Sequence, residues 1–256
     1  MPNIRTSNPI IINLNPSKTF KLLLYIIIGL TLANILVRLS EVFWENIPTI
    51  LVHLFNTDKE QNIPSVFSSI ILLFCSTMLY IIFRVKKDNR QHFKDWKILS
   101  IIFLVMSIDE LLSLHESLNA INKVMNNSGF LYLGWVIPAA GFVLIFILYF
   151  MGFIRTLPKK TRRLFIIAGT IYVTGALFLE LFAGYLVDPA TPNPNYFGPY
   201  PYLIQSSVEE FLEMIGIAIF SYALMSYITS YFKETNWIFR ITLGENNIVS
   251  TSPPKK

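Results

Sequence analysis

The sequence contains few charged side chains, one cysteine and three histidines, and each shortage excludes a class of protein. Only 14% of the 256 residues are charged and 53% are hydrophobic, with a mean hydropathy of +0.52, which excludes a soluble globular domain. Cys75 stands alone, so it cannot form a disulfide within the chain. Of the three histidines only His115 falls within an expected span, which argues against a catalytic zinc centre inside the membrane. The composition therefore predicts an integral membrane protein.

Six apolar stretches are long enough to cross a bilayer core of about 30 Å as helices. They predict an all-α, polytopic transmembrane helix bundle with six spans, at about 21–44, 64–84, 98–117, 133–154, 164–187 and 203–231. The spans form a membrane domain over 21–232. A flexible leader at 1–20 precedes this domain and a tail at 233–256 follows it.

Basic residues fall in alternate connecting segments, which predicts the orientation of the bundle. The segments before the first span, between the second and third, between the fourth and fifth, and after the sixth contain 18 of the 21 Lys and Arg residues. The positive-inside rule therefore predicts that both termini are cytoplasmic. Because this asymmetry explains the net charge of +5, we expect the lipid bilayer as a partner and no nucleic acid.

Acidic residues gather in the outer half of the predicted bundle. With a helical rise of about 1.5 Å per residue, Asp109 lies about 18 Å from the cytoplasmic end of the third span. An ionised carboxylate near the bilayer centre costs about 2.5–3.5 kcal/mol, so we expect such groups to face one another and share water, protons or a cation. The acidic residues of this half are Glu41, Asp109, Glu110, Glu116, Glu180, Glu209, Glu210 and Glu213.

Helical phase predicts which side chains of the third span converge. At about 100° per residue, Asp109, Glu110, Ser113 and Glu116 share one face, whereas His115 points elsewhere. The sixth span presents a similar face, and the two faces are expected to enclose a polar cavity open to the outside. Its residues in the sixth span are Ser206, Glu209, Glu210 and Glu213.

The first and fifth spans are expected to complete the cavity. Glu180 comes from the fifth span, and Arg38 and Glu41 come from the first. Arg38 and Glu41 also have the spacing of an intrahelical ion pair. For residues near a span end, such as Glu116 and Glu209, the alternative is a hydrated position among the headgroups with no further role.

The preferred prediction is a site that binds or translocates a cation, either a proton or a divalent metal ion. Its expected ligands are Asp109, Glu110, Glu180, Glu209, Glu210 and Glu213, with Glu116, His115, Glu41, Arg38, Ser113 and Ser206 as additional members. A divalent ion that prefers oxygen ligands, such as Ca²⁺, Mg²⁺ or Mn²⁺, is expected at Asp109, Glu110, Glu180 and Glu213.

Two other functions remain open. An intramembrane metal-dependent hydrolase acting on lipid is one, because Ser107, Asp109 and His115 are similar to the Ser, Asp and His that alkaline ceramidases place in a membrane bundle. A single histidine within the spans argues against this hydrolase. A non-catalytic assembly or accessory subunit is the other, with its polar groups contacting lipid headgroups or a partner helix.

Five motifs resemble those of a family of uncharacterised bacterial polytopic membrane proteins. They are FNTDKEQNIPS, SIDELLSLHE, LPKKTRRLF, GALFLELFAGY and EEFLEMIGI. The resemblance covers most of the chain from about 50 to 225 and implies a multi-pass protein of the bacterial inner membrane. Because the family brings no established activity, it transfers no role to any residue.

Overall fold

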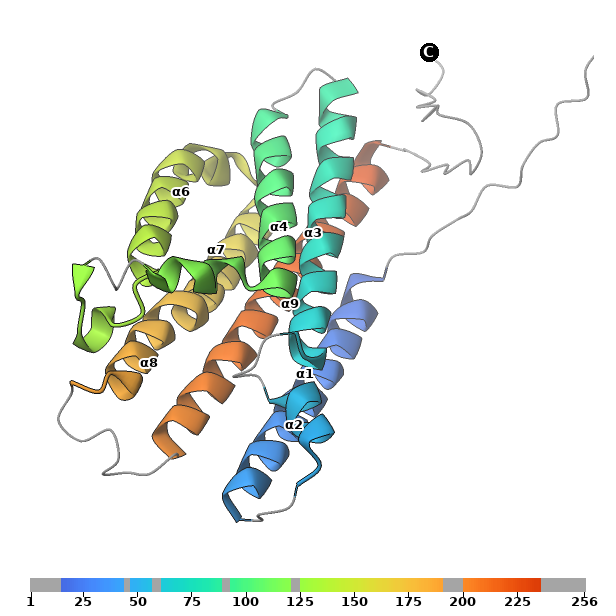
Figure 1. The fold of residues 1–256 in the computed structure, drawn as a ribbon. Coiled ribbons are helices and arrows are strands. Elements are labelled where there is room, and N and C mark those ends of the chain that lie inside the picture. Colours follow the sequence, from blue (N-terminus) through green and yellow to red (C-terminus); the bar gives the residue numbers. More distant parts are fainter. Residues whose placement is uncertain are drawn as a thin grey trace, which may run out of the picture.

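The computed structural model describes residues 15–43, 47–56, 61–88, 93–120, 125–190 and 200–235. Within these ranges the regular structure is helical and contains no β-strand, which confirms the predicted all-α class. Most of the expected leader and tail lies outside the described residues. The helices in chain order are α1 (Pro16–Phe43), α2 (Thr49–Phe55), α3 (Ile63–Asp88), α4 (Lys94–Leu112), α6 (Val136–Thr156), α7 (Lys159–Val173), α8 (Glu180–Val187) and α9 (Tyr200–Thr235) (Figure 1).

Three short helical segments complete the described structure. The 3₁₀ segments are η1 (Leu114–Ala120) and η2 (Gly129–Leu131). The π-helical segment η3 (Thr174–Leu179) joins α7 to α8 without a break in the helix. The fifth expected span is therefore a single helical stretch whose hydrogen-bonding pattern changes in the middle.

Five helical stretches of the described chain are long and apolar enough to cross a membrane. They are Pro16–Phe43, Ile63–Lys87, Val136–Thr156, Lys159–Val187 and Tyr200–Tyr231. Large apolar side chains cover the outer surface of the bundle. Ile145 and Leu148 of α6, for example, are 68% and 64% exposed. Such surfaces suit contact with lipid rather than water. Both observations support a membrane protein.

The helix α4 corresponds to the third expected span but is not among these five. Every stretch of 18 residues within its 19 contains Asp95, Lys97, Asp109 and Glu110, too many charges for a helix classified by composition alone. Composition therefore leaves the membrane crossing of α4 open.

The second expected span begins where its sequence predicts a helix start. The side chains of Asn62 and Ser65 form a reciprocal cap: the Ser65 N–H donates to Asn62 Oδ1 at 2.8 Å, and the Asn62 N–H donates to Ser65 Oγ at 3.0 Å. These bonds satisfy backbone donors that have no partner inside the helix. The sequence had placed the start at 64, and α3 begins at Ile63.

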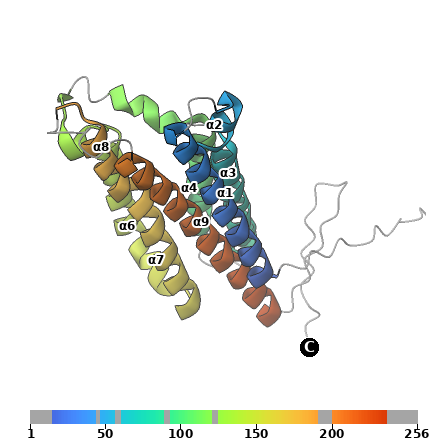
Figure 2. The same cartoon turned by 90° about the horizontal axis from the view of Figure 1, so that it is seen from below.

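Helix α9 is the central element of the bundle. It contacts α1 and α3 on one side and α7, η3 and α8 on the other (Figures 1 and 2). Its aromatic side chains enter the core, where Phe220 stacks on Phe103 of α4 with ring centroids 4.5 Å apart. Tyr227 stacks on Trp96 of α4 at 5.0 Å. The core thus connects α4 to α9 along much of its length.

Two pairs of serines join α3 to α4. Ser69 and Ser107 each donate a hydrogen bond to the other's carbonyl oxygen, at 2.7 and 2.8 Å. Ser76 and Ser100 do the same, at 2.8 and 2.9 Å. The reversed order of the pairs shows that the two helices are antiparallel, and small side chains allow their backbones to approach closely.

Contacts along α9 also establish the directions of its neighbours. Cys75 of α3 lies against Ser221, and further along both helices the Lys86 Nζ lies 4.2 Å from the ring centroid of Tyr231. Helices α3 and α9 therefore run in the same direction. On the other side, Phe165 of α7 packs on Phe220, 4.5 Å between ring centroids, while Leu179 of η3 contacts Gln205. The stretch from α7 to α8 is thus antiparallel to α9.

Two glycines allow this stretch to cross α9 in backbone contact. A Cβ atom at Gly216 would lie 2.9 Å from the backbone nitrogen of Tyr172. A Cβ atom at Gly175 in η3 would lie 2.9 Å from the carbonyl oxygen of Glu209. Because real Cβ atoms do not approach so closely, the crossing requires glycine at both positions. It holds η3 directly against the acidic segment of α9.

Candidate functional site

The site begins where α4 ends. Ser113 adopts the left-handed conformation, with φ of 53°, and its N–H donates to the Asp109 carbonyl at 2.6 Å. This conformation is uncommon for a residue other than glycine and stops the helix at Leu112. The expected helical span to 117 is therefore too long. Helical phase applies only within one helix, so the prediction that His115 points away from Asp109 is wrong.

Asp109 holds His115 through both of its carboxylate oxygens. The His115 backbone N–H donates to Asp109 Oδ1 at 2.9 Å. The Nδ1 atom of the imidazole lies 2.9 Å from Asp109 Oδ2, and the two side chains are 27% and 33% exposed. A protonated imidazole makes this contact an ion pair as well as a hydrogen bond. Asp109 thus fixes the position of η1 relative to α4.

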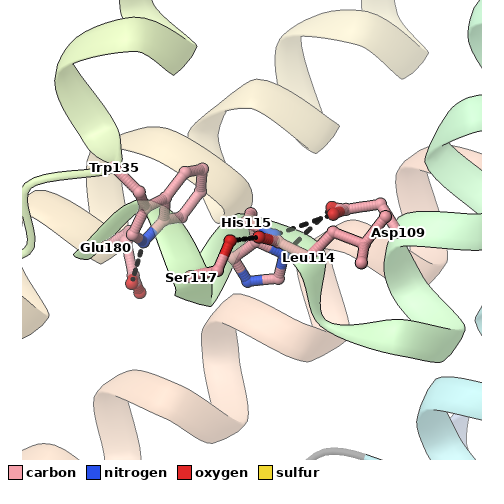
Figure 3. A network of polar contacts seen from close by, with 6 residues as sticks. All are labelled: Asp109, Leu114, His115, Ser117, Trp135 and Glu180. Carbon is pink, nitrogen blue, oxygen red and sulfur yellow. Dashed lines mark hydrogen bonds and ion pairs between the residues drawn. The ribbon is translucent and has the colours of Figure 1, made fainter. Parts of the chain in front are cut away.

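Trp135 continues the network on the other side of His115. Its indole ring lies 4.8 Å from the imidazole, measured between ring centroids. The indole N–H donates to Glu180 Oε1 at 2.9 Å, so the indole lies between the imidazole and the carboxyl group (Figure 3). Trp135 directly precedes α6 and Glu180 begins α8. One side chain therefore connects η1, α6 and α8.

Glu180 of α8 and Glu209 of α9 interact electrostatically across the contact between the two helices, and we call them the carboxyl pair. Two ionised carboxylates close to each other repel, and a proton on one of them removes this repulsion. The geometry can therefore hold one shared proton, as paired carboxyl groups do elsewhere.

Gln205 supports this pair from one turn earlier in α9. Its Nε2 donates to Glu209 Oε2 at 2.5 Å and to the Leu179 carbonyl at 3.0 Å. The side chain is buried, with 5% of the residue exposed. Its Oε1 has no hydrogen-bond partner in the structure. A buried acceptor without a donor is costly, so an additional donor at this point would be stabilising.

The remaining carboxylates approach the pair from α4 and α9. Glu213 interacts electrostatically with Glu110, Glu209, Glu210 and Glu180. Among the residues that the structure describes, however, no group of three or more His, Cys, Asp or Glu side chains could hold a metal ion. The set expected for a divalent ion, Asp109, Glu110, Glu180 and Glu213, is not assembled as a metal centre here.

Ser206 of α9 contacts Arg38 of α1, on a different side of α9 from the contact with α8. Arg38 is buried, donates from Nη1 to Ser206 Oγ, and lies 5.7 Å from the ring centroid of Tyr202. Asn34 donates to Ser207 Oγ at 2.9 Å in the same contact. Ser206 therefore faces α1 and joins two helices, which corrects its expected place on the acidic face.

Of three other expected members, the structure describes the side chains of two. The side chain of Glu41 is exposed at the end of α1. The side chain of Glu116 lies outside what the structure describes. Ser113 acts through its backbone, and its hydroxyl is buried without a hydrogen-bond partner.

The pocket found between α3 and α9 lies away from these residues. It is at the far ends of the two helices and is lined by Ile82, Val85, Lys86, Tyr227, Ile228 and Tyr231. The expected cavity at the carboxylates remains a prediction.

Sequence reasoning missed Trp135 and Gln205. Trp135 carries a weak signal, since it lies at the start of an apolar span, where tryptophan is common for reasons of membrane anchoring. Gln205 carries a better one, because it precedes Glu209 by four residues and side chains at this spacing meet on a helix. Neither signal predicts which residue of another helix Trp135 or Gln205 contacts.

Comparisons with known proteins give one match. A family model described as "Domain of unknown function (DUF8692)" matches residues 23–227. No curated protein matches the chain, and no solved structure does.

Proposed function

Since the chain belongs to this family of unknown function, which supplies no activity, we propose a function from the polar network itself. The protein is a multi-pass membrane protein that binds and translocates a proton through the Glu180–Glu209 carboxyl pair. The observation that carries the proposal is the set of donors at the pair: Trp135 donates to Glu180, and Gln205 donates both to Glu209 and to the carbonyl of Leu179, the residue before Glu180. These contacts bring the two carboxyl groups to one place, where a shared proton removes the repulsion between them.

The donors around the pair favour a proton over a metal ion. Trp135 donates an N–H to Glu180, and Gln205 donates one to Glu209. Each donor occupies a carboxyl oxygen and directs its partial positive charge at the site, which disfavours a cation that needs several oxygen ligands. A proton between the two carboxyl groups needs no further ligand. It also lowers the cost of keeping two acidic groups in a membrane.

The directions of the helices support six spans, and this number is part of the proposal. If α3 and α9 run the same way across the membrane, an odd number of crossings must separate them. Helix α6 and the stretch α7–η3–α8 supply two, so α4 must supply the third. Six crossings place both termini on one side, which is the cytoplasm by the positive-inside rule. We assign the protein to the bacterial inner membrane because its sequence motifs resemble those of bacterial polytopic membrane proteins.

The lipid hydrolase receives less support than proton binding. Its nucleophile would be Ser107, but the hydroxyl of Ser107 donates to the Ser69 carbonyl in the contact between α3 and α4. That hydroxyl is therefore already hydrogen-bonded in the contact between two helices, which disfavours a role as nucleophile. The accessory-subunit alternative is decided by the experiment below, because it requires no proton at the pair.

Proton flux in reconstituted liposomes tests the proposal. With a pH-sensitive dye inside, we expect flux through the wild-type protein. In Glu209→Gln and Glu180→Gln we expect a loss on the order of 10²-fold, the usual contribution of a positioned proton-transfer group. Glu41→Gln is the matched control, because this exposed glutamate lies outside the pair, and it should keep full flux.

Infrared spectroscopy of the carboxyl stretch gives a direct second readout. The wild-type protein should show a protonated carboxyl band that disappears in Glu209→Gln and persists in Glu41→Gln. Equal proton flux in the wild type and Glu209→Gln, together with no such band, would contradict the proposed function.

A further inference from the structure

His115 lies at the outer limit of the network, outside the regular helices. It belongs to η1, beyond the left-handed residue that ends α4. Its side chain is partly accessible, at 27% exposure. The indole of Trp135 lies between this side chain and Glu180 of the carboxyl pair. Histidine is the side chain that changes charge between about pH 5 and 8. The residue is therefore placed to respond to the pH at this end of the bundle.

We propose that the Asp109–His115 pair is a second proton-binding site, a pH sensor that sets the proton affinity of the Glu180–Glu209 pair through Trp135. This inference rests on the proposed function. The sensor and the carboxyl pair hold separate protons, and the indole of Trp135 touches both sites.

The sign of the coupling follows from the charges around His115. The titratable groups that face it are Asp109 of α4 and, beyond the indole of Trp135, Glu180 of α8; Glu116 follows it in the sequence. A proton on His115 adds a positive charge near Glu180, and this charge stabilises the ionised form of the carboxyl pair. Acidic pH outside therefore lowers the affinity of the pair for its shared proton.

Trp135 transmits the same effect by a second route. An imidazolium beside the indole ring is attracted to its π face. The cation also polarises the indole, so that its N–H becomes a stronger donor to Glu180. Both routes weaken proton binding at the pair when His115 is charged. By linkage, a proton on the pair lowers the proton affinity of His115 by the same free energy.

Two titrations of the full-length protein in detergent test this coupling. The carboxyl band of the Glu pair is followed against pH by infrared spectroscopy, and the imidazole of His115 by NMR of histidine-labelled protein. In His115→Gln the pH midpoint of the carboxyl band should rise by about 1 unit. In Asp109→Asn the midpoint of His115 should fall by about 1 unit, because its carboxylate partner is lost.

The control is His53→Gln, a histidine of α2 that is outside the network. It should leave both midpoints unchanged. If His115→Gln does not fold, Glu180→Gln serves as the reciprocal test, and it should lower the midpoint of His115.

The outcomes separate the two proposals. A carboxyl band whose midpoint is the same in His115→Gln and the wild type overturns the coupling alone and leaves the proposed function in place. Absence of the band from the wild-type protein overturns both. A His115 midpoint unaffected by Glu180→Gln also overturns the coupling.

Discussion

Trp135 is the residue on which the polar network depends most. Its ring contacts His115 and its indole N–H reaches Glu180, so a single side chain makes one apolar and one polar contact. Tryptophan suits this role because its ring is large and its one donor has a fixed direction. Neither phenylalanine, which lacks the donor, nor a small polar residue, which lacks the ring, can make both contacts.

Trp135→Phe should separate the two contacts. The ring contact with His115 remains, while Glu180 loses a donor, which raises the proton affinity of the carboxyl pair. We expect the free energy of unfolding to fall by about 0.5–1.5 kcal/mol and the midpoint of the carboxyl band to rise.

Chemical denaturation in detergent and infrared titration measure the two effects. Trp96→Phe is the comparison, since Trp96 is buried in the apolar core. That variant should lose stability and keep the carboxyl midpoint. A midpoint that moves equally in both variants would contradict a specific role for Trp135.

Residue by residue, the sequence predicted the acidic groups better than their partners. Glu180 and Glu209 were expected at a common site from depth and helical phase alone, since both depend only on position within a span. The partners of Asp109, Glu180 and Glu209 come from η1, α6 and the preceding turn of α9. Hydrophobic periodicity cannot predict the end of helical phase at Ser113, and it cannot predict contacts between segments that are distant in the sequence.

The α3–α4 hairpin depends on its serine pairs at the scale of secondary-structure elements. In lipid there is no hydrophobic force to bring two apolar helices together, so close packing and hydrogen bonds take its place. The seven-residue spacing of Ser69 and Ser76 in α3 matches that of Ser100 and Ser107 in α4, so both pairs fall on one seam. This seam holds the helix that carries Asp109.

Ser76→Leu should disrupt the seam. A leucine at this buried position forces α3 and α4 apart, and we expect the free energy of unfolding to fall by about 1–3 kcal/mol. The matched control is Thr77→Leu, one residue further along α3 and exposed, which should have little effect.

Thermal or denaturant unfolding in detergent measures the difference between the two variants. Equal stability of Ser76→Leu and Thr77→Leu would show that the seam does not limit the approach of the helices. A seam of serines was not expected from the sequence, where the third span was interpreted through its acidic residues alone.

At the scale of the whole molecule, the helices whose directions the contacts establish alternate: α4 is antiparallel to α3, and the stretch from α7 to α8 is antiparallel to α9. The sequence predicted this alternation from apolar length and basic loops, and the structure supports five of the six helices by composition. The membrane crossing of α4 is not supported by composition, because both ends of this helix contain charged residues. The parallel course of α3 and α9 is the geometric argument that the sequence could not supply.

Cysteine labelling of α4 tests the crossing. In cells of a bacterial host, a membrane-impermeant thiol reagent should label Leu118→Cys from outside and should not label Lys94→Cys. Both positions are exposed in the structure, so access depends on the side of the membrane. The native Cys75 is fully buried and gives a low background. Labelling of both variants from outside would place α4 on the outer surface and contradict six spans.

The π-helical segment η3 makes the position of Glu180 depend on chain length as well as on residue identity. A short π segment accommodates one extra residue within an α-helix, so everything beyond it is rotated by about 100° relative to an uninterrupted helix. Removing one residue from 174–179 would leave a long apolar helix of nearly the same composition, with Glu180 turned away from Trp135 and Glu209. Deletion of a single codon in this segment, which changes neither glutamate, is therefore sufficient to abolish the carboxyl pair.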